Sequence, residues 1–426
     1  MIRRLLGQGD GAEARSQTGE LLCAIDVGTT KICALIAELD DEGELHVIGA
    51  GRVPSKGLRR GVVINTNDAK ASIAQAVVEA EGSADQLMRE AYVGISGNHI
   101  NTIGSKGVIA VGRNGRAVTR EDTQRALDQA RNIALPHNRE IIHAVPRSYT
   151  VDEQRGILEP IGMFAYRLEV DASIITGAAS AIQNLVNVVH AHGVQVRDLV
   201  LQPLASAEAV LTDDERRLGV ALVDIGGGTM DMAIYLEGSP WHTQIMDVAG
   251  EHFIKDVAQG LRMPFDKAEA LIKRYGHVLP DVVPYDAEVR WDRFGQQGQQ
   301  TISRRMLAEI LNARASDVVE LILREVKRSG YDGMLSAGVV LTGGVSQLTG
   351  LLDLSQEELQ WPVRIGRPNG VASSVLDLSS PEYATAVGLL LWGLRRGTEP
   401  RVPEPKEPTI LERARRWLKG FLPGSG

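Results

Sequence analysis

The sequence predicts an α/β protein of several domains built around a duplicated strand–turn–strand unit. The chain has 426 residues, enough for about two to four ordinary domains. Hydrophobic residues make up 43% and charged residues 23%, so the chain can bury cores of normal size. The segment AIDVGTTK at 24–31 returns in altered form as LVDIGGGTMD at 222–231. Each copy is an apolar run that ends in Asp, followed by a turn of Gly and Thr.

The composition argues against nucleic acid as a partner. The net charge is -8 and aromatic residues are only 4%, so the chain repels phosphate backbones and offers little stacking surface. Cys23 and Cys33 lie on apolar runs, which favours buried thiols in a reducing cytosol over a redox pair. The apolar run at 383–394 is too short for a membrane span, and residues 1–20 lack the pattern of a signal peptide. We expect residues 1–20 to form a flexible leader.

The first elements of the chain are predicted to be three strands and a helix. Apolar runs at 21–26 and 31–39, and a third that begins at 45, predict a strand, a hairpin and two further strands. The segment 67–82 has helical spacing of its apolar residues, with Asn67 or Asp68 as the capping residue. A further strand is expected at 92–96.

An inserted α+β unit is expected next. Residues 97–170 consist of short strand-like pieces and turns around one polar helix, for which Thr119 is the capping residue. A helix that ends at Gly193, a strand at 196–202 and a single helix at 203–219 then lead into the second hairpin.

The second half of the chain turns helical after its hairpin. Apolar spacing predicts helices at 253–261, 265–276 and 303–330. A buried strand, a Gly-Gly turn and a helix follow at 337–354, and a second apolar helix covers 384–394. The expected units are a leader at 1–20, a first lobe at 21–96 and 171–216, the insertion at 97–170, a second lobe at 217–252 and 314–394, a helical subdomain at 253–313, a proline-rich linker at 395–408 and a tail at 409–426.

The two hairpins are predicted to clamp a triphosphate. In a dinucleotide site or a P-loop the glycines lead into a helix, whereas here each turn leads into another strand. Such tips present backbone N–H groups and hydroxyls to phosphate oxygens. Asp26 and Asp224 offer hard oxygens to a hydrated magnesium ion, and Lys31 offers a point charge to the β- or γ-phosphate. The expected tip contacts are Gly28, Thr29, Thr30, Gly226, Gly227, Gly228 and Thr229.

The nucleoside end and the hydrolytic residues are less specific in the sequence. Gly343 and Gly344 lie between a strand and a helix, where they either contact the nucleoside or form an ordinary turn. Glu269 and Lys273, four residues apart, either reach adenine or ribose or form a surface salt bridge. In the segment LQPLASAEAVL, which resembles the connect-1 motif of the ATPase superfamily named below, the candidates for orienting an attacking water are Gln202 and Glu208, and spacing alone identifies neither. For each of them a helix surface or cap position is the simpler interpretation, so the sequence favours an ATP-binding switch with slow or negligible hydrolysis.

Five motifs, in order, resemble those of a known superfamily. The five segments are DVGTTK, LQPLASAEAVL, DIGGGTMD, VVLTGGVSQLTGL and EYATAVGLLLWG. In this order they resemble the phosphate-1, connect-1, phosphate-2, adenosine and connect-2 motifs of the actin, sugar kinase and heat-shock chaperone ATPases. Across residues 21–394 the chain resembles the bacterial cell-division family FtsA, notably through KGLRRGVV and YVGISGNHI. The resemblance implies an actin-like ATPase fold of two lobes, whose duplicated ribonuclease-H-like domains are subdomains 1A and 2A. It also implies that the inserted unit is subdomain 1C and that the helical subdomain is 2B. Ile254 stands where relatives carry Thr or Ser.

The resemblance also implies a function. Such a protein binds ATP and Mg²⁺, polymerises on the cytoplasmic face of the inner membrane at the division site, tethers FtsZ there and helps recruit later division proteins. The FtsZ peptide is expected on the helical subdomain near Arg304, Glu309 and Arg314. The alternatives are a pilus-assembly ATPase, a sugar kinase, which needs a catalytic Asp beside a sugar pocket, and a chaperone, which needs a large substrate domain after the second lobe.

The last residues predict an amphipathic membrane-binding helix. Thr409 and Glu412 are spaced as a capping box directly after the prolines. Four basic side chains oppose the single Glu412, which suits an anionic lipid surface, although the same stripe could pack on the protein's own body. The apolar stripe is Ile410, Leu411, Ala414, Trp417, Leu418, Phe421 and Leu422, and the basic residues are Arg413, Arg415, Arg416 and Lys419.

Overall fold

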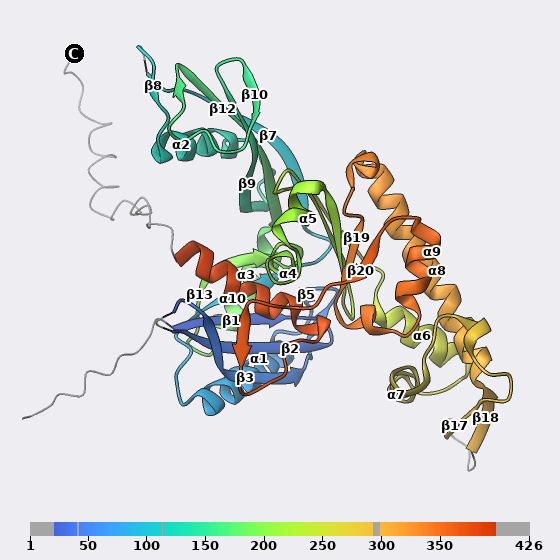
Figure 1. Cartoon of the computed structure of the whole chain (residues 1–426). Coiled ribbons are helices and arrows are strands. Elements are labelled where there is room, and N and C mark those ends of the chain that lie inside the picture. Colours follow the sequence, from blue (N-terminus) through green and yellow to red (C-terminus); the bar gives the residue numbers. More distant parts are fainter. Residues whose placement is uncertain (1–20, 41, 113, 293–298, 398–426) are drawn as a thin grey trace, which may run out of the picture.

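The computed structural model describes residues 21–40, 42–112, 114–292 and 299–397 (Figure 1). The expected leader, the linker from residue 398 onward and the tail lie outside these residues. Within the described ranges no helix is long and apolar enough to span a membrane.

The first lobe is a six-stranded sheet in the order β13-β6-β1-β2-β3-β21. Strands β1 to β3 are antiparallel, whereas β6 and β13 run parallel to β1. Side chains alternate between the two faces of a strand, so Cys23 and Ile25 pack with α1 and α3 while Leu22 and Ala24 face α10. The strands are β1 Leu21–Val27, β2 Lys31–Leu39, β3 Leu45–Pro54, β6 Glu90–Ile95, β13 Gln195–Leu201 and β21 Val371–Ser373. The helices are α1 Thr66–Ala84, α3 Ala179–His190 and α10 Ala384–Gly397, and a small hairpin pairs β4 Leu58–Arg59 with β5 Val62–Val63.

The second lobe repeats this arrangement in a five-stranded sheet, β16-β15-β14-β19-β20. Strands β14 to β16 are again antiparallel, and β19 and β20 run parallel to β14. The duplication seen in the sequence is therefore confirmed as a duplicated sheet. The strands are β14 Val220–Ile225, β15 Met230–Leu236, β16 Ser239–Met246, β19 Val339–Thr342 and β20 Val363–Ile365.

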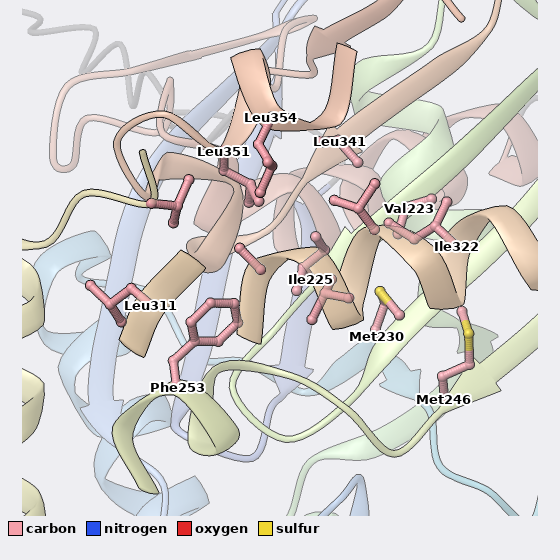
Figure 2. Close-up of a cluster of buried hydrophobic side chains, with 14 of the residues drawn as sticks. Val223, Ile225, Met230, Met246, Phe253, Leu311, Ile322, Leu341, Leu351 and Leu354 are labelled. Carbon is pink, nitrogen blue, oxygen red and sulfur yellow. The ribbon is translucent and has the colours of Figure 1, made fainter. Parts of the chain in front are cut away.

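One apolar cluster holds the second sheet to its helices. Figure 2 shows Val223 and Ile225 of β14 and Met230 of β15 packed against Phe253 and Ile322 of the covering helices. The helices on this face are α6 Gly250–Gly260, α8 Arg304–Ser329 and α9 Leu351–Leu359, and α4 Gln202–Val210 and α5 Asp213–Leu218 lie on the opposite side. Beside α6 lies α7 Phe265–Tyr275, and the hairpin of β17 Glu288–Asp292 and β18 Gln299–Ser303 contacts α8. The short helices are η1 Pro280–Val282 and η2 Asp332–Met334, which contact α8, η3 Gly344–Gln347, which contacts β14 and β19, and η4 Pro381–Tyr383, which contacts α10.

The insertion between β6 and α3 forms its own sheet and core. The sheet order is β10-β9-β12-β7, and α2 packs on it. Thr119 caps α2 in a capping box with Asp122, as the sequence predicts. The elements are β7 Asn101–Ala110, β8 Arg116–Ala117, α2 Arg120–Arg131, β9 Arg139–Val151, β10 Gln154–Ile157, β11 Phe164–Ala165 and β12 Arg167–Ala178.

Three details differ from the sequence-based expectation. The N-cap of α1 is Asn65, neither Asn67 nor Asp68, because its side chain accepts hydrogen bonds from both of those backbone N–H groups. The helix expected over 203–219 is two helices, since Thr212 begins α5 with its own capping box. The segment 371–394, expected in the second lobe, supplies β21 and α10 to the first sheet.

Helices α4 and α10 join the two lobes by crossing each other at close range. Both helices belong to one apolar cluster that also contains side chains of β1 and of β14. Gly388 of α10 lies against the backbone of Ala205, and a Cβ on Gly388 would lie well inside van der Waals contact of the Ala205 carbonyl oxygen. The crossing therefore depends on a residue without a side chain.

Replacing Gly388 by Ala should lower the free energy of unfolding by about 1 to 3 kcal/mol, because the two helices must separate to admit the methyl group. The matched control is Gly82→Ala in α1, where a Cβ meets nothing within 4 Å and the change should be neutral or stabilising by up to about 1 kcal/mol. Urea unfolding of both variants measures the difference. Equal stabilities would contradict a tight crossing.

Candidate functional site

The tips of the two hairpins have the same backbone geometry and touch each other. The Gly28 N–H donates to the Lys31 carbonyl at 3.1 Å, and the Gly226 N–H donates to the Thr229 carbonyl at 3.0 Å. A Cβ on Gly227 would overlap the side chain of Thr30, and a Cβ on Gly228 would overlap Thr29. The second tip is made of glycines because the threonines of the first tip fill that space.

A cavity of about 630 Å³ lies around these tips, between the two lobes. Every residue predicted to contact nucleotide lines it. From the first hairpin these are Asp26, Gly28, Thr29, Thr30 and Lys31, from the second Asp224, Gly226, Gly227, Gly228 and Thr229, from α7 Glu269 and Lys273, and after β19 Gly343 and Gly344. The structure thus brings together segments more than 300 residues apart in one cleft, and the nucleotide contacts themselves stay a prediction.

Asp26 and Asp224 form the buried floor of the cleft. Burial raises the pKa of Asp26 to about 6, against the opposing effect of the Lys31 ammonium. Burial also raises the pKa of Asp224, although Ser206 and Thr385 donate hydrogen bonds to it at 2.6 and 3.2 Å. Both carboxyl groups are costly to keep ionised in this place without a cation.

A third buried carboxyl group, Asp231, was not among the predicted site residues. It lies opposite Asp224 in the β14–β15 ladder, and burial together with the Asp224 charge raises its pKa to about 8. Ser96, the residue directly after β6 in the first lobe, donates a hydrogen bond to Asp231 at 2.7 Å. The signal was present in the sequence, because Asp231 is the last residue of the repeated motif LVDIGGGTMD.

The two residues considered for water orientation lie in different places. Gln202, the first residue of α4, lines the cleft, and its side-chain amide donates to Asp26 at 3.1 Å. Glu208 forms ion pairs with Arg216 at 3.0 Å and Arg395 at 2.6 Å and does not line the cleft. The structure therefore brings Gln202 to the floor of the cleft and leaves Glu208 in a helix-to-helix ion pair.

Lys31 is held by residues that sequence reasoning did not select. Its ammonium group donates to the backbone carbonyl of Glu382, lies 3.6 Å from the Glu382 carboxylate and sits 4.2 Å from the centre of the Tyr383 ring. Arg52 contacts the same carboxylate at 2.9 Å. Lys31, Arg52 and Glu382 all line the cleft.

The end of the cleft that is predicted to hold the nucleoside has an apolar wall and a charged rim. The wall includes Ile254, Ile272 and Leu348, so Ile254 presents an alkyl side chain where relatives are expected to carry a hydroxyl. Glu269 and Lys273 form an ion pair at 2.6 Å. Both side chains are well exposed, so the pair is a surface salt bridge at the edge of the cleft.

The charges of the cleft fit a bound cation. Six carboxyl groups and three cationic side chains line it, so a triphosphate needs additional positive charge to enter. In the part of the chain that the structure describes, no group of three or more His, Cys, Asp or Glu side chains is placed to hold a metal ion. Hydrated Mg²⁺ asks for only one or two carboxylates beside the phosphates, and Asp26 and Asp224 fit that requirement.

The three residues predicted to bind FtsZ all lie on α8, outside the residues that line the cleft. Arg304 donates to the Tyr275 carbonyl at 3.0 Å. Arg314 pairs with Asp256 at 2.6 Å, and Glu309 lies 3.7 Å from Arg305. The two arginines are half-buried and already have acceptors, whereas Glu309 is exposed.

His143 links the insertion to the start of α4. It lies on β9, and its Nε2 accepts a hydrogen bond from the Leu201 N–H at 3.1 Å, directly before Gln202. Its ring lies 5.2 Å from that of Trp392 on α10. Burial, followed by the positive charges of Arg396 and Arg131, lowers the pKa of His143 to about 3.

Each of the two lobes is built on its own sheet, the two sheets share one strand order, and the lobes meet at the paired hairpin tips. This arrangement defines the actin-like ATPase fold. Solved structures of this fold are similar over most of the chain. The PilM-PilN type IV pilus biogenesis complex matches with a TM-score of 0.62 at 16% identity, covering 89% of this chain and 99% of that chain. MreB 5 of Spiroplasma citri bound to AMPPNP matches with a TM-score of 0.54 at 14% identity, covering 89% and 98%.

Sequence comparison identifies the family within this class of proteins. The family pattern "Cell division protein FtsA" matches residues 221–388, and "SHS2 domain inserted in FTSA" matches 97–176. The cell division protein FtsA of Pseudomonas aeruginosa is 38% identical over 417 residues, which cover 96% of this chain and 99% of the relative. The chain belongs to the FtsA family of cell-division proteins.

Acid should destabilise the protein through His143. The pKa of His143 is about 3 in the folded protein, below the ordinary 6.5. As the pH falls, His143 therefore becomes protonated in the unfolded chain while it stays neutral in the folded protein. This contribution to stability is complete above pH 6.5 and is lost as the pH falls toward 3. Between pH 7 and 5.5, His143→Gln should lose about 1 kcal/mol less unfolding free energy than the parent. Urea unfolding at the two pH values measures this, and identical losses would contradict it.

Proposed function

We propose that this chain is an ATP- and magnesium-binding scaffold of bacterial division. It would polymerise on the cytoplasmic face of the inner membrane, tether FtsZ to that surface and help to recruit later division proteins. The observation that carries the nucleotide part is the meeting of two equivalent hairpin tips over Asp26 and Asp224. Family membership supports the division role, and the similar fold of MreB with AMPPNP supports the choice of nucleotide.

Each part of the clamp has a distinct task in this proposal. The backbone N–H groups of both tips and the hydroxyls of Thr29 and Thr30 bind phosphate oxygens. Asp26 and Asp224 hold the hydrated metal ion, which neutralises phosphate charge when bound. Lys31 adds a positive charge at the first tip.

The geometry favours binding over turnover. Gln202 is the one water-orienting candidate of the two that reaches the cleft, and its amide is engaged by Asp26. Water attack requires a group free to hold the water in line with the phosphate. We therefore propose slow or negligible hydrolysis.

Replacing Asp224 by Asn should abolish magnesium-dependent ATP binding while the protein stays folded. The amide oxygen can still accept hydrogen bonds from Ser206 and Thr385, and removing a buried charge relieves a desolvation cost. Calorimetric titration with ATP, with and without Mg²⁺, measures the effect. If the variant bound ATP-magnesium as tightly as the parent, the clamp would be wrongly assigned.

Attachment to FtsZ and to the membrane would use two separate regions. The arginines of α8 would exchange their internal acceptors for the carboxylates of an acidic FtsZ peptide. The predicted tail helix would insert its apolar stripe into an anionic membrane, where each basic residue contributes about 1 kcal/mol. A single tail would bind reversibly, and a filament with many tails would bind firmly because of its effective concentration.

A vesicle co-sedimentation assay separates the two attachments. Deleting residues 409–426, or changing Trp417 to Glu, should leave both this chain and FtsZ in the supernatant with anionic phosphatidylglycerol vesicles. The double variant Arg304→Glu and Arg314→Glu should sediment with the vesicles but leave FtsZ behind. Arg324→Glu, at an exposed pair with Glu320 on the same helix, is the control for charge reversal on α8. Sedimentation that survives the deletion, or FtsZ recruitment by the double variant, would place the contact elsewhere.

A further inference from the structure

The phosphate-binding cation of the first tip is already paired with an acid of the same chain. Lys31 contacts the carboxylate, the carbonyl and the neighbouring ring of the segment Glu382–Tyr383. Its side chain is 17% exposed and that of Glu382 is 25% exposed, so water screens this pair only partly. The attraction between the Lys31 and Glu382 charges is therefore stronger than in a fully exposed ion pair.

The Glu382 carboxylate is held in place from the opposite side as well. Arg52, on β3, contacts Glu382 Oε2 at 2.9 Å, the same oxygen that lies near Lys31. Glu382 belongs to η4, and the carbonyl of Pro381, the first residue of η4, accepts a hydrogen bond from the Gly343 N–H at 3.2 Å. The acid is thus positioned by the first sheet and by the loop after β19, and it is not a freely rotating surface side chain.

We propose that Glu382 is an internal competitor for the phosphate-bearing ligand of the cleft. This inference rests on the proposed nucleotide site. A phosphate that binds Lys31 must share or displace the Glu382 carboxylate, because both are anions and both need the same ammonium group. Glu382 therefore lowers the affinity of the cleft for polyphosphate and keeps the cation neutralised when no phosphate is present.

The competitor acts only on the phosphate part of the ligand. The nucleoside end of the cleft, at Ile254, Ile272 and Leu348, is formed by other elements. Removing the Glu382 charge should therefore change the affinity for ligands that carry phosphates and leave the affinity for the nucleoside unchanged.

The test compares the full-length parent with Glu382→Gln, which keeps the size of the side chain and removes its charge. Calorimetric titration with ATP-magnesium should show about three- to tenfold tighter binding by the variant, whereas adenosine binding should not change. In a background with both Lys31→Ala and Arg52→Ala the same substitution should produce no gain, because both cations contact the Glu382 carboxylate. Glu382→Ala is the second variant, used if the glutamine variant does not fold.

The outcomes separate the competitor from the site itself. If the parent shows no ATP binding, the proposed nucleotide function fails. If the parent binds ATP and Glu382→Gln binds it equally or more weakly, the competitor is refuted. A gain that persists without both Lys31 and Arg52, or that appears equally with adenosine, also refutes it, because the acid would then act through general charge or through the fold.

Discussion

The close crossing of α4 and α10 is the constraint on which both the fold and the site depend. Gly388 and Ala205 bring the helix backbones together, so each helix can contact both sheets. The N-terminal turns of these same helices supply the side chains that bond the buried aspartates. Gln202 of α4 donates to Asp26, and Thr385 of α10 donates to Asp224. A change that separates the helices would therefore also shift the hydrogen-bond donors of the cleft floor.

The electrostatic character of the cleft follows from where the chain places its charges. The acids Asp26, Asp224 and Asp231 are buried, which raises the pKa of each. The cations Lys31 and Arg52 lie nearer to solvent and share the acid Glu382. A site with this layout gains most from a ligand that brings a metal cation to the floor and anionic oxygens to the edge.

The parts of the protein that sequence predicts well are those that depend on neighbouring residues. An apolar run ending in Asp and a Gly-Thr turn is enough to place both hairpins, and Thr119 is a recognisable cap. Contacts between distant segments were missed, because no local pattern shows that Glu382 approaches Lys31 or that Arg216 and Arg395 engage Glu208. Likewise α10 is apolar enough to fit either lobe, and only packing decides that it covers the first sheet.

The contact between the two hairpin tips limits how alike the two halves of the chain can be. Thr29 and Thr30 fit only because Gly227 and Gly228 have no side chains. Two copies of the first hairpin would bring four threonine side chains into the same space. Two copies of the second hairpin would lack the hydroxyl groups that Thr29 and Thr30 supply. A symmetric dimer of the first half could therefore not form this contact, so the geometry of the cleft requires two different tips.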